Sequence, residues 1–145
     1  MRMIHAITMA LGVLGSAPCQ EKPGKIDEEN LQGTWILKSI EIQGKTEKAP
    51  DGEASFTFSK TQVTMKSKGS DDRVGTFKVN SGKSPKQLDM KAKMEKGKPD
   101  ETMQCLYEFK DGRLLLAYSL KGPGSPRPKV MDSKEALIMT LELKK

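Results

Sequence analysis

From Gly33 onward, apolar and polar residues alternate in short runs separated by Gly, Asn, Asp, Ser and Pro. A period of two places successive side chains on opposite faces of a β-strand, and frequent turn residues are typical of all-β sandwiches and barrels. The clearest run sets Leu88, Met90, Ala92 and Met94 against charged residues. The pattern predicts eight strands, near 34–43, 53–59, 61–68, 73–79, 88–95, 103–109, 114–120 and 135–143.

Eight antiparallel strands joined in sequence order favour an up-and-down barrel, because closure removes the edges of the sheet. A two-sheet sandwich is the alternative. Within the first strand the inward phase changes from Trp35 and Leu37 to Ile40 and Ile42, which predicts a bulge near residues 38–39. Asp111-Gly112 predicts a tight hairpin, residues 27–32 a single helical turn, and residues 122–128 a long open loop.

The first nineteen residues have the layout of an export signal. One Arg precedes an apolar run from Ile4 to Leu14, and small residues follow. The run is shorter than the about 20 apolar residues that a transmembrane helix needs. We therefore expect a signal peptide over 1–19, a polar linker over 20–29 and a barrel over 30–145. The mature protein is then periplasmic, secreted or, as a minority alternative, lipid-anchored through Cys19.

Several chemistries are disfavoured by composition. Loss of the signal removes His5, the only histidine, and with it Ser-His-Asp catalysis and His-ligated zinc. The two cysteines, Cys19 and Cys105, are too few for a disulfide framework or a Cys-rich metal site. Lysines account for most of the +6 net charge and are scattered, unlike the clustered charge of nucleic-acid surfaces. We expect no enzyme activity, no metal, no cofactor and no nucleic-acid partner.

Six short motifs resemble known exported β-domains. Leu31-Gln32-Gly33-Thr34-Trp35 resembles the Gly-x-Trp start of lipocalins, and the wider layout is similar to a family of small exported domains expanded in planctomycete bacteria. The other five motifs are Gln43-Gly44-Lys45, Gly75-Thr76-Phe77, Pro85-Lys86-Gln87-Leu88-Asp89, Tyr107-Glu108 and Leu141-Glu142-Leu143-Lys144. The resemblance implies a lipocalin-like barrel with no assigned activity.

Inward-facing aromatic residues are the candidate ligand contacts. These residues are Phe56, Phe58, Tyr107 and Tyr118. The tyrosine hydroxyls need polar partners, which a ligand, each other or a buried water would supply. Three further residues are expected to be structural: Gly33, Trp35 as a plug of the closed barrel end rather than part of a ligand mouth, and Cys105 as a buried, unpaired thiol.

Two functions remain open. The first is a filled barrel that acts through its surface as an interaction module for an unknown protein or envelope partner, with the loop 122–128 as its contact. The second is lipocalin-like binding of a small apolar or amphipathic ligand inside the barrel. The large inward residues favour the filled barrel, because protein interiors are close-packed.

Overall fold

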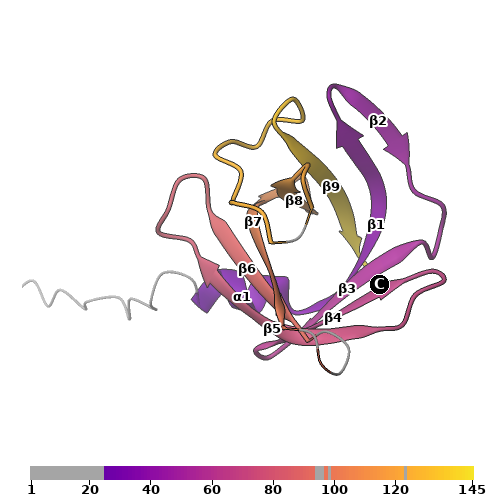
Figure 1. The fold of residues 1–145 in the computed structure, drawn as a ribbon, viewed down its shortest axis with the longest axis vertical. Helices are drawn as coiled ribbons and strands as arrows, with labels where there is room; N and C mark the ends of the chain where they lie inside the picture. Colours follow the sequence, from indigo (N-terminus) through magenta and orange to yellow (C-terminus); the bar gives the residue numbers. More distant parts are fainter. Residues whose placement is uncertain (1–24, 94–96, 98, 123) are drawn as a thin grey trace, which may run out of the picture.

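The computed structural model describes residues 25–93, 97, 99–122 and 124–145 (Figure 1). The expected signal peptide over 1–19, with His5 and Cys19, and the inward position predicted for Met94 lie outside these residues. In the described part of the chain, no helix has the length and apolar character needed to cross a membrane.

A closed antiparallel barrel follows one short helix, as the alternation predicted (Figure 1). The sheet order is β2-β1-β3-β4-β5-β6-β7-β8-β9, and pairing of β1 with β9 closes eight of the strands into a ring. The elements are α1 (Lys25–Leu31), β1 (Gly33–Ile42), β2 (Lys45–Lys48), β3 (Ala54–Ser59), β4 (Gln62–Ser67), β5 (Arg73–Asn80), β6 (Gln87–Ala92), β7 (Glu101–Lys110), β8 (Arg113–Ser119) and β9 (Ala136–Leu143). The helix begins within the stretch expected to be polar linker.

Strand β1 has two partners on one of its sides. Its first half pairs with β3, from Gly33 opposite Phe58 to Ile36 opposite Ser55, and its second half pairs with β2. On its other side, the register with β9 shifts between Leu37 and Ser39, so the predicted bulge is confirmed. Strand β2 was not predicted, because its sequence KTEK contains no apolar residue and all four residues are exposed.

The Asp111-Gly112 hairpin between β7 and β8 is also confirmed. Both residues have positive φ, 54° and 74°, as a primed two-residue turn requires.

The inward faces of the strands form one continuous core. Its most deeply buried side chains include Phe58, Val63, Leu88, Met90, Tyr107, Leu114, Leu116 and Leu141. Alternation along the predicted strands 114–120 and 135–143 places Leu120 and Leu143 on the inward face, but they are 42% and 46% exposed. The reason is that Leu120 lies beyond the last residue of β8, and Leu143 is the last residue of β9. Alternation therefore predicts burial less well at the ends of strands than in their middle.

A second, smaller core lies outside the barrel wall. Leu106, Ala117, Ala136 and Ile138 are buried on the outer face of β7–β9, and Met131 packs against them. The connection between β8 and β9 is held over this wall by Arg127, which donates to the Cys105 carbonyl at 2.9 Å and to Asp89 at 2.5 Å. The described residues of 122–128 form a loop, as predicted, and hydrogen bonds of Gly124 and Arg127 tie that loop to the barrel.

Among the described glycines, Gly75 has the least space for a side chain. A Cβ at this inward position of β5 would lie 1.9 Å from the Lys91 carbonyl oxygen of β6. The backbone at Lys91 cannot move aside without breaking the hydrogen bonds between β5 and β6. We expect Gly75→Ala to lower the free energy of unfolding by about 3 kcal/mol, as overpacked cores do, measured by urea denaturation. In the matched control Gly82→Ala, the new Cβ would lie 3.5 Å from the Asn80 side chain, an ordinary contact. Equal stability of the two variants would contradict this packing.

Candidate functional site

The interior of the barrel is filled at one end and open at the other. At the closed end, Leu31 of α1 is fully buried in the core. At the opposite end a cavity of about 390 Å³ opens to solvent; we call it the mouth cavity. Its apolar wall is made of Leu37, Ile40, Ala54, Phe56, Met65, Met103, Tyr118 and Met139. The prediction of a filled interior therefore describes only the closed half.

Three methionines give the mouth cavity an adaptable apolar wall. Met65, Met103 and Met139 come from β4, β7 and β9 and converge on the same space. The unbranched thioether side chain of methionine fits ligands of varied shape. Tyr118 adds a phenol from β8, and burial raises its pKa, so the hydroxyl remains a hydrogen-bond donor at neutral pH.

The rim of the mouth cavity carries both signs of charge. Glu53 and Asp71 lie there with Lys66 and Arg73. Arg73 is 3.8 Å from Glu101, and Lys66 is 3.8 Å from Asp72, both as solvent-accessible pairs. Such pairs contribute at most about 1 kcal/mol. The rim charges are thus free to rearrange around a ligand.

The four aromatic residues predicted to contact a ligand lie in two places. Phe56 and Tyr118 line the mouth cavity. Phe58 and Tyr107 are each 1% exposed and belong to the filled half. Phe58 packs edge-on against Phe77 with ring centres 5.0 Å apart. The structure therefore brings only two of the four together at an open site.

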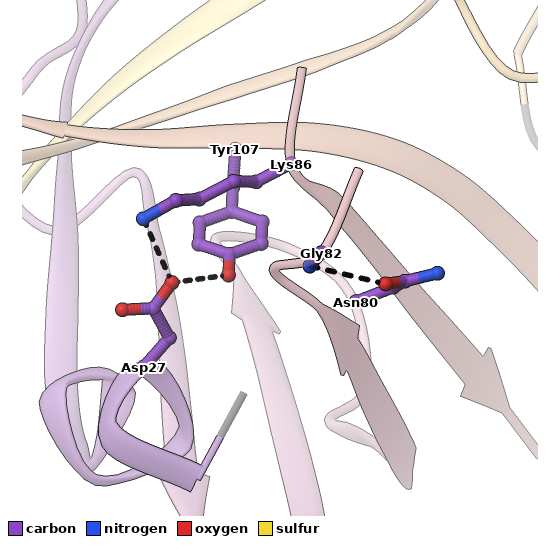
Figure 2. Close-up of polar contacts among 5 residues, drawn as sticks. All are labelled: Asp27, Asn80, Gly82, Lys86 and Tyr107. Atoms are coloured by element: carbon purple, nitrogen blue, oxygen red, sulfur yellow. Dashed lines mark hydrogen bonds and ion pairs between the residues drawn. The ribbon is translucent and has the colours of Figure 1, made fainter. Parts of the chain in front are cut away.

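Figure 2 shows a polar cluster that fastens α1 to the closed end. The Tyr107 hydroxyl donates to Asp27 Oδ2 at 2.6 Å, and Lys86 Nζ donates to the same oxygen at 3.0 Å. The Asp27 side chain is only 12% exposed. The Tyr107 hydroxyl thus has a protein partner in a residue that the sequence pattern placed in a linker.

Trp35 also lies at the closed end, away from the mouth cavity. Its indole Nε1 donates to the Leu31 carbonyl at 2.8 Å, and its ring lies 6.1 Å from that of Phe109. Gly33, two residues earlier, has φ of +116°, and a Cβ there would meet Leu143 at 2.9 Å. Trp35 therefore binds the end of α1, and Gly33 allows the backbone conformation with which β1 begins.

Cys105 is buried and free, as predicted. Burial raises its thiol pKa to about 12, and the neighbouring Arg127 only partly opposes this. A thiol that is protonated at neutral pH is a poor nucleophile and metal ligand. Within the described residues, no three His, Cys, Asp or Glu side chains are grouped so that they could hold a metal ion.

Comparison with protein-family models, with curated proteins and with solved structures gives no match to this chain.

Removing the Asp27 carboxylate should expose the coupling in the closed-end cluster. We expect Asp27→Ala to destabilise the protein by about 1–3 kcal/mol, because the buried Tyr107 hydroxyl loses its acceptor. Tyr107→Phe in the Asp27→Ala background should cost less than Tyr107→Phe alone. Thermal or urea unfolding of the four proteins gives the coupling energy, with Asp72→Ala as an exposed control. Strictly additive effects would show that the two side chains do not interact.

Alkaline pH should destabilise the fold. Burial, joined for Tyr107 by its hydrogen bond to Asp27, raises the pKa of Cys105 and of Tyr107 above their ordinary values. Above about pH 9 the unfolded chain loses these protons before the folded chain does, so the stabilisation present at lower pH is lost towards pH 12. Each group contributes a slope of up to about 1.4 kcal/mol per pH unit. Cys105→Ala should therefore show a shallower loss between pH 9 and 11 in urea unfolding. A slope equal to that of the parent protein would contradict the assignment.

Proposed function

We propose that this protein is an exported, non-enzymatic binding protein that holds a small amphipathic molecule in the mouth cavity. The observation that carries the proposal is the mouth cavity itself. Small-molecule sites are typically apolar hollows of about 300–1,000 Å³ with a few polar groups, and a volume of about 390 Å³ is at the lower end of that range. The ligand is then small, or enters with only part of its length.

The character of the cavity wall supports an amphipathic rather than a purely apolar ligand. Methionine and phenylalanine supply apolar contacts, while the Tyr118 phenol and the charged side chains of the lining supply polar ones. A ligand with an apolar part and a polar end satisfies both zones.

The sequence favoured the other function, an interaction module that acts through its surface with the loop 122–128 as its contact. We place it second, because the mouth cavity offers a defined site and part of the loop is held against the barrel. Arg127 donates hydrogen bonds to the Cys105 carbonyl and to Asp89, and the Gly124 amide donates to the Thr102 carbonyl at 3.2 Å. This part of the chain has a structural use, the cover of the outer core.

Besides the Tyr118 phenol, the ionisable groups of the cavity are its charged lining residues, which include the carboxylates Glu53 and Asp71. Export remains part of the proposal on the strength of the sequence of residues 1–19, and so does the likeness to the exported planctomycete domains.

Filling the mouth cavity should abolish ligand binding while leaving the fold intact. We expect the parent protein to bind an apolar fluorescent dye, and Met65→Trp to weaken that binding at least about tenfold because the indole occupies the cavity. The control Val74→Trp places the same ring on the outer face of β5, where Val74 is 45% exposed. Circular dichroism and melting temperature verify folding. A parent protein that binds no dye, and yields no lipid to mass spectrometry after isolation from its native envelope, would refute the proposal.

A further inference from the structure

A groove on the outside of the barrel is lined by three lysines and by no acidic residue. Lys66, Lys68 and Lys144 surround a hollow of about 330 Å³ between the open ends of β3 and β4 and the end of the chain. The remaining lining residues are small or carry hydroxyl groups, apart from Ile36: Thr34, Gly52, Ala54, Ser55 and Ser67. A concave site whose only charges are ammonium groups attracts anions.

The acids near this groove leave most of its charge uncompensated. Asp72 lies 3.8 Å from Lys66, in a pair more than half exposed at both ends. Asp51 and Glu142 both pair with Lys38, outside the groove. Neither Lys68 nor Lys144 forms an ion pair with any other described residue. At least two positive charges are thus available to a ligand.

The lysine groove and the mouth cavity share one wall. Ala54, Ser55, Lys66 and Ser67 line both hollows. Ala54 and Ser55 begin β3, and Lys66 and Ser67 end β4 directly opposite them, so the shared wall lies at the open end of the barrel. The mouth cavity is apolar with rim charges of both signs, whereas the groove carries only positive charge. Together the two hollows form one continuous amphipathic surface across the rim.

We propose that the ligand is a single-chain amphipath with an anionic head group. Its apolar chain enters the mouth cavity between Met65, Met103 and Met139. Its head group crosses the rim at Ser55 and Ser67 and binds the ammonium groups of Lys66, Lys68 and Lys144. This inference rests on the proposed function, since it assigns the chemistry of the ligand to the same site.

Three probes with the same ten-carbon chain separate the contribution of the head from that of the chain. These are decanoate, decanol and decyltrimethylammonium, titrated calorimetrically below their aggregation limits at low salt. We expect decanoate to bind about tenfold more tightly than the other two, because opposite charges within about 4 Å attract even in a solvated site. At 0.5 M salt the preference should largely disappear, since exposed charges are then screened.

Charge removal assigns the preference to the groove. Lys68→Gln combined with Lys144→Gln should abolish the preference for decanoate and leave decanol binding unchanged. Lys78→Gln combined with Lys110→Gln removes the same charge from positions that line neither hollow, and should keep the preference.

The outcomes distinguish the two proposals. Equal binding of all three probes, or a preference that the Lys68 and Lys144 substitutions do not reduce, would overturn the anionic ligand and leave the binding function standing. Binding of inorganic phosphate as tight as that of decanoate would make the groove a simple anion site and would also overturn it. Failure of all three probes to bind would refute the proposed function and this inference together.

Discussion

The pairing of β1 with β9 is the interaction on which the rest of the molecule depends. It joins the first and last strands of the chain, so every inner strand acquires two neighbours and no edge of the ring is left unpaired. The bulge at Lys38 lets β1 meet this demand while changing partner from β3 to β2 along its other side. Closure thus encloses the interior, and the change of partner along β1 leaves its second half paired with β2 and not with β3.

Division of the interior into two halves follows from what closes each end. At one end α1 lies across the ring, anchored by the Trp35 indole and by the bond from Tyr107 to Asp27, and Leu31 and Phe58 are buried in the core there. At the other end no described helix covers the opening, and flexible methionines surround a cavity. The aromatic rings of Trp35, Phe58 and Tyr107 thus stabilise the closed end, while methionines line the opening together with Phe56 and Tyr118.

Features that depend on neighbouring residues could be predicted from the sequence. The strands, the bulge at Lys38, the Asp111-Gly112 turn and the buried Cys105 all follow from local periodicity or local backbone preference. Periodicity assigns a side chain to the inner face but not to a depth along the barrel axis. For this reason Phe58 and Tyr107 could not be separated from Phe56 and Tyr118 as ligand contacts.

Features that depend on distant contacts could not be predicted. Asp27 is buried only because Tyr107 and Lys86, about 60 to 80 residues later, converge on it. The four-residue strand β2 has no apolar position and is held by backbone pairing alone. The outer core was foreshadowed only by apolar residues at outward positions, Leu106 and Ile138, which a strictly alternating pattern treats as exceptions.

The outer core makes the barrel wall mechanically unequal. Strands β7–β9 are gripped from both faces, by the interior and by the segment that Arg127 and Met131 hold in place. The outer face of β5, by contrast, meets solvent at Val74, Thr76 and Lys78. Bending the β7–β9 side would disrupt two packed layers, whereas bending the β3–β5 side disrupts one. We therefore expect the side that carries the lysine groove to deform more easily than the opposite side, and this side includes the rim that a ligand would cross.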